Sequence, residues 1–412
     1  MRDFWRFAAI AIVLLLMQPA AWGAAEADLP VSAPVATAAS LALQTDSNIR
    51  WAMAQLLTLA IPLFFLFTGL GARLRRKCDQ ITGRRWFLTV TLFAVGYLAL
   101  AALITMPFDF YTQYVQPHAD GRSDQPFQDW LSYEVVQIAI RLVAAALLIW
   151  LPYRLIARSP RRWWLWGTLA LLPFAFLVLV GLPVWIDPLT NHYEPLNDPA
   201  MAARIETLAA RCGVPHIPVF VGGGSTAVTG LGPTNRIVLQ SNLTEVETPD
   251  QIDFTIGHEL KHYVMGDNWK ALAIIGAFLL GGFWLTDRLG RAAIGRFAKL
   301  WGVEGLADPA SLPLVMFLLT FLWLAILPGF NLFARHIEHE ADRFGLELTH
   351  QNHATAAMFA DQPQSEVTPD WDSFFLIMRA THPSNAQRVA FANSYKPWEQ
   401  GKKLAYDHVC GP

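Results

Sequence analysis

Six long apolar stretches limit what this chain can fold into more than any other feature. A helix that crosses a bilayer needs about 20 predominantly apolar residues. The stretches cover residues 51–70, 86–107, 135–152, 163–185, 271–286 and 312–333. The fifth is short, but it lacks the polar face that a soluble core helix would show. Since 54% of the 412 residues are hydrophobic and only 16% are charged, we predict a mainly α, polytopic membrane protein.

Residues 1–25 have the layout of a secretory signal peptide or an N-terminal anchor. Two arginines precede an apolar run from Ala8 to Met17, and small residues follow. The apolar run is too short to span a bilayer comfortably, which favours a signal peptide cleaved near Gly23 over a retained anchor. Residues 26–48 are rich in Ala, Pro, Ser and Thr. We therefore expect a disordered tether there.

The charged residues between the apolar stretches orient them in the membrane. Arginine and lysine fill the loops after the first, third and fifth stretches. The positive-inside rule places these three loops in the cytoplasm. Residues 108–134, by contrast, carry five acidic residues against one arginine. Alternating spans then put this loop, residues 187–268 and the C-terminal tail on the non-cytoplasmic side.

Residues 257–262 read Gly-His-Glu-Leu-Lys-His and contain an HExxH motif. The preceding Thr-Pro-Asp-Gln at 248–251 combines an N-cap, a proline at the first helical position and a capping-box partner. A helix therefore begins there, and His258 and His262 project from one of its faces towards one metal ion. Glu259 lies beside that ion, where it can take a proton from the attacking water. The motif predicts one zinc ion, with Glu259 as general base.

A catalytic zinc ion has three protein ligands and one open position, so a third ligand is needed. The best candidate follows the last apolar stretch, where Glu338 and Asp342 are four residues apart on one helix face. We assign Glu338 to the zinc ion. Asp342 is assigned to accept the remaining N–H of a ligating histidine. His336, His339 and Glu340 are the alternative ligands in the same segment.

Residues 187–268 resemble a small water-exposed α+β domain between the fourth and fifth stretches. Its predicted elements are a helix at 199–212, strands at 217–222 and 236–240, and the HExxH helix. Zincins bind substrate as an extra strand along a sheet edge. Residues 225–232 are predicted to form that edge, with a plain hairpin as the alternative. Ser225, Thr226 and Ala227 are the candidate substrate-binding residues.

The chain after the last apolar stretch offers two more candidates for catalysis. His382 precedes a proline, and Arg388 follows at the start of a predicted helix. A histidine and an arginine near the zinc ion can stabilise the oxyanion that forms when water attacks. From spacing alone, an ordinary His-Pro turn is the alternative.

Four further residues fall outside these motifs. Arg141 lies inside the third apolar stretch, where it faces a watery cavity, pairs with a carboxylate or extends to the membrane interface. Cys78, Cys212 and Cys410 have no metal-binding spacing, so we treat them as bystanders. The predicted topology puts Cys212 and Cys410 on the same side, which permits a bridge without requiring one.

In this order the motifs resemble those of the integral-membrane zinc endopeptidases of the type I CAAX prenyl protease family. The resemblance runs from about residue 86 onward. It is carried by Pro107-Phe108, 186–191, 195–196, 229–232, 236–239, HExxH, Glu338-x-x-Ala341-Asp342, His382-Pro383 and Arg388. It implies a multi-helix transmembrane chamber with a small α+β zincin domain, zinc near one mouth of the chamber and Arg141 in its lining. It also implies a zinc-ligand role for Glu338, an orienting role for Asp342, and oxyanion stabilisation by His382 and Arg388.

Three departures from the family pattern concern substrate recognition. Residues 225–227 read Ser-Thr-Ala where the family has Asn-Ala-Tyr, Lys261 replaces a glycine, and Pro117 replaces a glutamate. The charge pattern also places the site outside the cytoplasm, whereas prenyl proteases act on cytosolic tails. We therefore do not extend prenylated substrates to this chain.

These observations predict a zinc metalloendopeptidase of the bacterial inner membrane that cleaves exported or membrane-associated proteins on the periplasmic side. Its partners are a protein or peptide substrate and the lipid bilayer; no basic stripe indicates nucleic acid. A weak or inactive homologue acting in assembly or quality control is the alternative. A transporter fits less well, because no internal repeat is evident. The expected segments are 1–25 (signal or anchor), 26–48 (tether), 49–186 (membrane helices), 187–268 (catalytic domain), 269–333 (two membrane helices) and 334–412 (C-terminal catalytic part).

Overall fold

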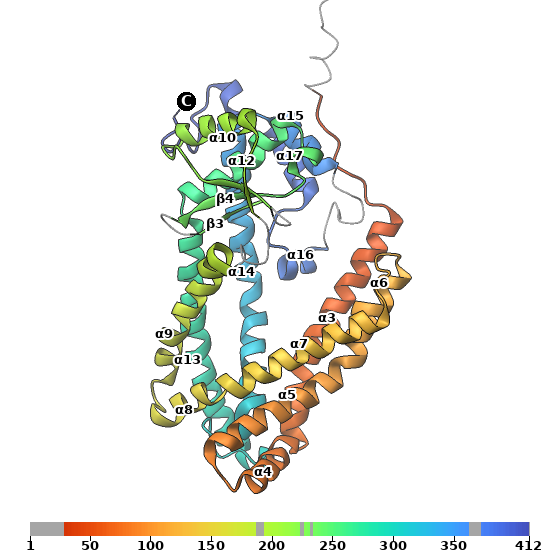
Figure 1. Ribbon diagram of the computed structural model, residues 1–412, viewed down its shortest axis with the longest axis vertical. Coiled ribbons are helices and arrows are strands. Elements are labelled where there is room, and N and C mark those ends of the chain that lie inside the picture. Colours follow the sequence, from red (N-terminus) through yellow and green to blue (C-terminus); the bar gives the residue numbers. More distant parts are fainter. Residues whose placement is uncertain (1–28, 187–192, 223–225, 231–233, 362–371, 412) are drawn as a thin grey trace, which may run out of the picture. The chain divides into compact units, whose positions relative to one another are not determined.

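A computed structural model describes residues 29–186, 193–222, 226–230, 234–361 and 372–411 (Figure 1). The chain divides into two compact units. The helical unit comprises residues 42–187 and 267–332, and the sheet-containing unit comprises 1–41, 188–266 and 333–412. The predicted signal peptide or anchor, 1–25, lies outside the described residues.

The helical unit contains the predicted membrane stretches. Its elements are α3 (Ala38–Phe67), α4 (Leu70–Thr82), α5 (Trp86–Phe110), the π-helix η1 (Tyr111–Val115), α6 (Gln116–Ala119), α7 (Phe127–Leu148), α8 (Trp150–Arg158), α9 (Trp163–Phe176), the π-helix η2 (Leu177–Ile186), α13 (Asp267–Trp301), the 3₁₀-helix η5 (Pro309–Ser311) and the first part of α14 (Leu312–Thr349). Among the described residues, five helical segments are long and apolar enough to cross a membrane. They are Ala38–Phe67, Trp86–Ala119, Phe127–Arg158, Asp267–Trp301 and Pro309–Thr349. The prediction of a polytopic, mainly helical membrane protein is confirmed.

The fourth apolar stretch differs from the other five. It begins as the shorter apolar helix α9 and continues as the π-helix η2 to Ile186. Pro173 lies inside α9 and has no backbone N–H to donate, so the regular hydrogen-bond ladder is interrupted there.

The prediction of a disordered tether at 26–48 is wrong for its second half. Helix α3 already begins at Ala38, and the Thr37 hydroxyl accepts a hydrogen bond from the backbone N–H of Ser40 at 3.1 Å. This is the N-cap arrangement that starts a helix. Upstream, the backbone of Val31 exchanges two hydrogen bonds with the Asn393 side chain, at 3.0 and 2.8 Å. Composition indicated disorder, but a cap and an Ala/Leu-rich sequence favour the helix.

Arg141 lines a small polar cavity between α5 and α7, together with Asp109 and Glu134. Its Nε donates to the carbonyl of Gln137 at 3.2 Å. In the described part of the chain it forms no ion pair with a carboxylate and its side chain is exposed, which leaves the watery cavity and the membrane interface as the two alternatives from the sequence.

The sheet-containing unit is built on a four-stranded sheet with the order β1-β2-β4-β3. The strands are β1 (Glu194–Pro195), β2 (Val219–Val221), β3 (Ala227–Thr229) and β4 (Arg236–Leu239). Strands β2 and β4 are parallel, while β1 and β3 pair antiparallel with their neighbours. Strand β3 is therefore an edge strand.

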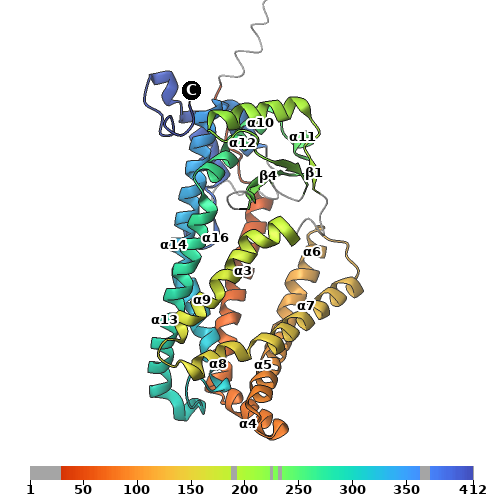
Figure 2. The ribbon, with the colours of Figure 1, turned by 60° about the vertical axis from the view of Figure 1, so that its left-hand side comes forward.

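Helices surround this sheet (Figures 1 and 2). They are α10 (Pro199–Arg211), α11 (Leu243–Val246), α12 (Pro249–Val264), the C-terminal part of α14, α15 (Asn352–Ala360), α16 (Ser373–Arg379), α17 (Asn385–Ser394) and the 3₁₀-helix η6 (Pro397–Gln400). Ile237 and Leu239, two residues apart on β4, share one sheet face and are buried in a single core with residues of α10, α12 and α14. This core fixes α12 against the sheet.

A disulfide joins Cys212, at the end of α10, to Cys410 near the C-terminus. Both sulfurs belong to the core that packs α10 and α12 on the sheet. Treating these two cysteines as bystanders is therefore wrong, whereas Cys78 is free and buried. The pairing could not be inferred from spacing, because the two residues are 198 positions apart.

Candidate metal centre

Helix α12 carries the HExxH motif and begins where the sequence predicts. Thr248 is its N-cap and forms a reciprocal capping box with Gln251: the hydroxyl accepts from the Gln251 N–H and the Gln251 side chain accepts from the Thr248 N–H. Pro249 occupies the first helical position. These interactions satisfy backbone donors at the helix start and leave the motif in a regular helix.

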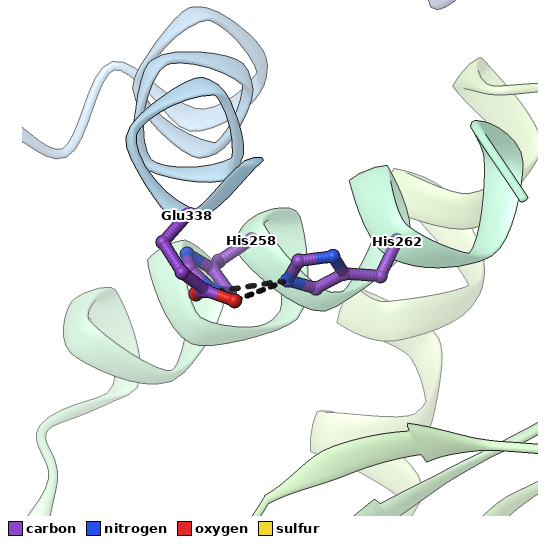
Figure 3. Close-up of side chains that lie close together, drawn as sticks. All are labelled: His258, His262 and Glu338. Atoms are coloured by element: carbon purple, nitrogen blue, oxygen red, sulfur yellow. Dashed lines mark hydrogen bonds and ion pairs between the residues drawn. The ribbon is translucent and has the colours of Figure 1, made fainter. Parts of the chain in front are cut away.

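Three potential metal ligands converge in the structure (Figure 3). The nearest ligand atoms of His258, His262 and Glu338 all lie within 4.8 Å of one another. The two Nε2 atoms are 3.3 Å apart, and Glu338 oxygens lie 3.3 Å from His258 Nε2 and 3.9 Å from His262 Nε2. Tetrahedral zinc with bonds of about 2.0–2.1 Å places its donors about 3.3 Å apart. The donor set therefore fits a zinc ion in both chemistry and spacing.

The alternative ligands are not part of this group. Glu340 pairs with Arg343 at 2.9 Å and accepts from the Tyr406 hydroxyl at 2.7 Å. The His339 ring packs on Phe391, with 4.4 Å between ring centroids. Within the described ranges, His258, His262 and Glu338 are the three residues that form such a ligand group.

A close crossing of α12 and α14 brings the ligands together. A Cβ on Gly257 would lie 3.0 Å from Gly345 Cα, and a Cβ on Gly345 would lie 3.2 Å from the backbone nitrogen of His258. Both distances are shorter than ordinary carbon contacts of about 3.5–4.0 Å. The absence of side chains at these two positions lets the helix that carries the histidines approach the helix that carries Glu338.

Asp342 lies behind His258 and orients its ring. His258 Nδ1 is 3.0 Å from Asp342 Oδ1. Burial alone lowers the pKa of His258, but hydrogen bonds to Asp342 and Glu338 outweigh it and raise this pKa to about 9 in the metal-free protein. A hydrogen bond from Nδ1 leaves Nε2 as the ligand nitrogen.

Arg388 continues this chain of contacts. Its Nε donates to Asp342 Oδ2 at 2.8 Å and its Nη2 to Oδ1, in a two-point ion pair. The guanidinium also lies over the Phe359 ring, 3.8 Å from the centroid. Arg388 thus contacts Asp342, and Asp342 contacts His258. This differs from the sequence prediction, in which Arg388 faces the reacting carbonyl.

Glu259 is buried next to the histidines and is held by strand β3. It is 8% exposed, and its Oε2 accepts a hydrogen bond from the Val228 backbone N–H at 2.9 Å. Burial raises the pKa of Glu259, while the neighbouring histidines oppose the rise. A carboxylate that binds a proton more readily than usual suits proton transfer near neutral pH.

Of the remaining candidate residues, His382 lies beside a metal ligand, whereas the predicted substrate-binding residues lie at strand β3 or outside the described residues. His382 Nε2 lies 3.2 Å from Glu338 Oε2, and the His382 side chain is 55% exposed. Ala227 begins edge strand β3, and the Thr226 hydroxyl accepts from the Gln240 N–H at 3.1 Å. Ser225 lies outside the described residues.

Two contributors were missed by sequence reasoning. Val228 acts through its backbone N–H, which carries no sequence signal. Gly345 is a glycine inside a helical segment, a pattern that often marks a close packing contact.

The chain is similar to known membrane proteases in both its sequence and its fold. A model described as peptidase family M48 matches residues 195–396, and one described as CAAX prenyl protease N-terminal, five membrane helices, matches residues 40–192. The metalloprotease YhfN of Bacillus subtilis is 29% identical, covering 80% of this chain and 79% of its own. CAAX prenyl protease 1 of Saccharomyces cerevisiae is 23% identical, covering 73% and 71%. The crystal structure of S. mikatae Ste24p superposes with a TM-score of 0.68 at 19% identity, covering 85% of this chain and 87% of that chain.

Proposed function

Because the chain belongs to the M48 membrane metalloproteases of the CAAX prenyl protease type, we propose that it is a zinc-dependent endopeptidase of a bacterial inner membrane. Its substrates are exported or membrane-associated proteins. The observation that carries the proposal is the convergence of His258 Nε2, His262 Nε2 and a Glu338 carboxylate oxygen, with the Glu259 carboxylate beside them.

Zinc is the ion that this mixed nitrogen and oxygen donor set suits, and it would supply the Lewis acidity that makes water nucleophilic near neutral pH. Glu259 accepts the proton of the attacking water and later delivers it to the leaving amine. The Val228 N–H holds the Glu259 carboxylate in place during both transfers.

The other candidate residues orient a zinc ligand or stabilise the oxyanion. Asp342 and Arg388 keep His258 in the tautomer that presents Nε2. His382, which lies beside Glu338 and has a 55% exposed side chain, donates to the oxyanion of the attacked carbonyl.

The substrate is proposed to bind as an added strand on β3. An edge strand offers backbone groups that an extended peptide can pair with, whatever its side chains. Thr226 and Ala227 lie at the start of this edge, close in sequence to Val228, which contacts the general base.

The catalytic side is proposed to be periplasmic. Disulfides persist in oxidising compartments, and the Cys212–Cys410 bridge lies in the unit that carries the metal ligands. The arginine-rich loops independently favour the same orientation. Prenylated substrates are not included in the proposal, since the relatives named for them are distant and this orientation opposes access to cytosolic tails.

The test compares the purified wild type with Glu259→Gln on an unstructured reporter protein, with metal content measured on the same samples. We expect one zinc per chain in both proteins, and cleavage that falls by about 10²–10⁴-fold in the variant. A wild type that holds stoichiometric zinc and cleaves no better than Glu259→Gln would favour the alternative of a non-catalytic assembly or quality-control factor.

A further inference from the structure

Lys261 is a buried lysine in the middle of the metal-binding motif. It lies between the two ligating histidines on α12 and is 2% exposed. Its Nζ donates to the backbone carbonyl of Ile337 on α14 at 2.9 Å. Burying an ammonium group is costly unless hydrogen bonds compensate for the lost water. The Ile337 carbonyl is one of the groups that provide this compensation.

The hydrogen bond from Lys261 is made to the peptide group that joins Ile337 to Glu338, the third ligand. The Ile337 carbonyl and the Glu338 N–H belong to one planar peptide group, so fixing the carbonyl also fixes the start of the Glu338 residue. Lys261 therefore connects the helix of His258 and His262 to the position from which the Glu338 side chain reaches them.

A second contact makes this connection effective. The close approach of Gly257 and Gly345 holds α12 and α14 together eight residues beyond Ile337 on α14, which is about 12 Å along the helix. One contact point leaves two helices free to change their crossing angle, whereas two separated points define it. The Gly257–Gly345 contact sets the distance near His258, and the Lys261 bond sets it at the level of Glu338.

We infer that Lys261 is a positioning residue for the metal site: by hydrogen bonding the Ile337 carbonyl, it holds Glu338 where it can share one ion with His258 and His262. The inference rests on the proposed metal site. It does not depend on peptide cleavage.

The test removes the ammonium group and keeps most of the side-chain volume. Lys261→Met is compared with the wild type and with Lys402→Met, which removes an exposed lysine of the same unit. Zinc affinity is measured by competition with a chromogenic chelator. The visible spectrum of the cobalt-loaded protein reports ligand geometry, and thermal unfolding of the metal-free protein reports stability.

For Lys261→Met we expect zinc affinity to fall about 10–100-fold, as for other groups that orient metal ligands, and the cobalt spectrum to change. We expect no loss of stability in the metal-free protein, because an apolar side chain is buried more easily than an ammonium group. Lys402→Met should match the wild type. Should Lys261→Met fail to fold, Lys261→Gln, which keeps a shorter neutral donor, should show the same two changes.

Wild-type zinc affinity and an unchanged cobalt spectrum in the folded Lys261 variant would overturn the inference, as would a loss of stability without a loss of affinity. A wild type that binds zinc but does not cleave would overturn the proposed protease function and leave this inference standing. A wild type that binds no zinc would overturn both.

Discussion

Replacing Gly345 by alanine should open the crossing of α12 and α14 and weaken the metal site. The added Cβ would lie 3.0 and 3.1 Å from two ring carbons of Phe254 and 3.2 Å from the backbone nitrogen of His258. Phe254 is 1% exposed, so its ring has little room to move away. The backbone of α12 cannot yield without moving His258, so the helices must separate by several tenths of an ångström to restore contacts of about 3.5 Å.

The expected cost is the difference between two effects. Crowding in a packed core costs about 1–3 kcal/mol. Replacing glycine by alanine inside a helix contributes about 0.5–1 kcal/mol in the opposite direction. Gly329 provides a control on the same helix, because a Cβ there would meet no atom within 4 Å. Gly345→Ala should therefore be less stable than Gly329→Ala by about 1–3 kcal/mol.

The metal site provides a second and more specific measurement. Ligands must be held to about 0.5 Å of their productive positions, and the helix shift is of that order. We expect zinc affinity to fall in Gly345→Ala and to stay at the wild-type value in Gly329→Ala, measured by chelator competition alongside thermal unfolding in detergent. If Gly345→Ala kept wild-type affinity and gained stability as Gly329→Ala does, the close crossing would not be what positions the ligands.

Three further predictions concern charge, pH and the disulfide. Arg388→Ala should lower zinc affinity by about 10-fold or more, as loss of a group that orients a ligand does; a loss of turnover at unchanged affinity would instead support direct oxyanion contact. In the metal-free protein the pKa of His258 is raised to about 9 from 6.5, so its protonation stabilises the fold fully below pH 6.5. That stabilisation should disappear between pH 6.5 and 9, while stabilisation by added zinc increases over the same range. The test measures the unfolding temperature of metal-free wild type and His258→Gln as a function of pH. Equal slopes of unfolding temperature against pH in the two proteins would contradict the prediction. Cys410→Ser should destabilise the protein by less than the roughly 5 kcal/mol of chain entropy that a 198-residue separation implies, because the bilayer already confines the intervening helices. An unfolding temperature equal to that of wild type under oxidising conditions would show that the bridge adds nothing.

The sequence was sufficient for features that depend on a single segment. Apolar length identified the membrane helices, and the capping box located the start of α12 at Pro249. Helical spacing placed His258 beside His262 and Glu338 beside Asp342. These relations follow from helix geometry, which places residues four apart on the same face of every α-helix.

Hydropathy does not determine where a helix begins or ends. The last apolar stretch ends near residue 333, which is also where the two units divide, but α14 continues across this point without interruption to Thr349. Similarly, α3 begins at Ala38, inside the expected tether. Hydropathy reports the environment of a segment, but a helix continues as long as its residues favour helical backbone and no proline or cap ends it.

Relations between segments could not be read from the sequence. The hydrogen bond from Val228 to Glu259 uses a backbone N–H that every residue except proline has. The Cys212–Cys410 bridge and the Gly257–Gly345 contact join positions far apart in the chain. No pattern within one helix specifies such contacts, since they depend on how the helices cross.

Arg388 shows how such a contact changes a functional assignment. The family resemblance implied a direct role at the oxyanion, which requires donors aimed at the reacting oxygen. Two of the three guanidinium nitrogens instead donate to Asp342, whose side chain is 3% exposed. Moving Arg388 to the oxyanion would leave that buried carboxylate without its cation, at a cost of several kcal/mol. We therefore expect the ion pair to be retained during catalysis, so that Arg388 acts on the reaction through the orientation of His258, as the zinc affinity of Arg388→Ala will test.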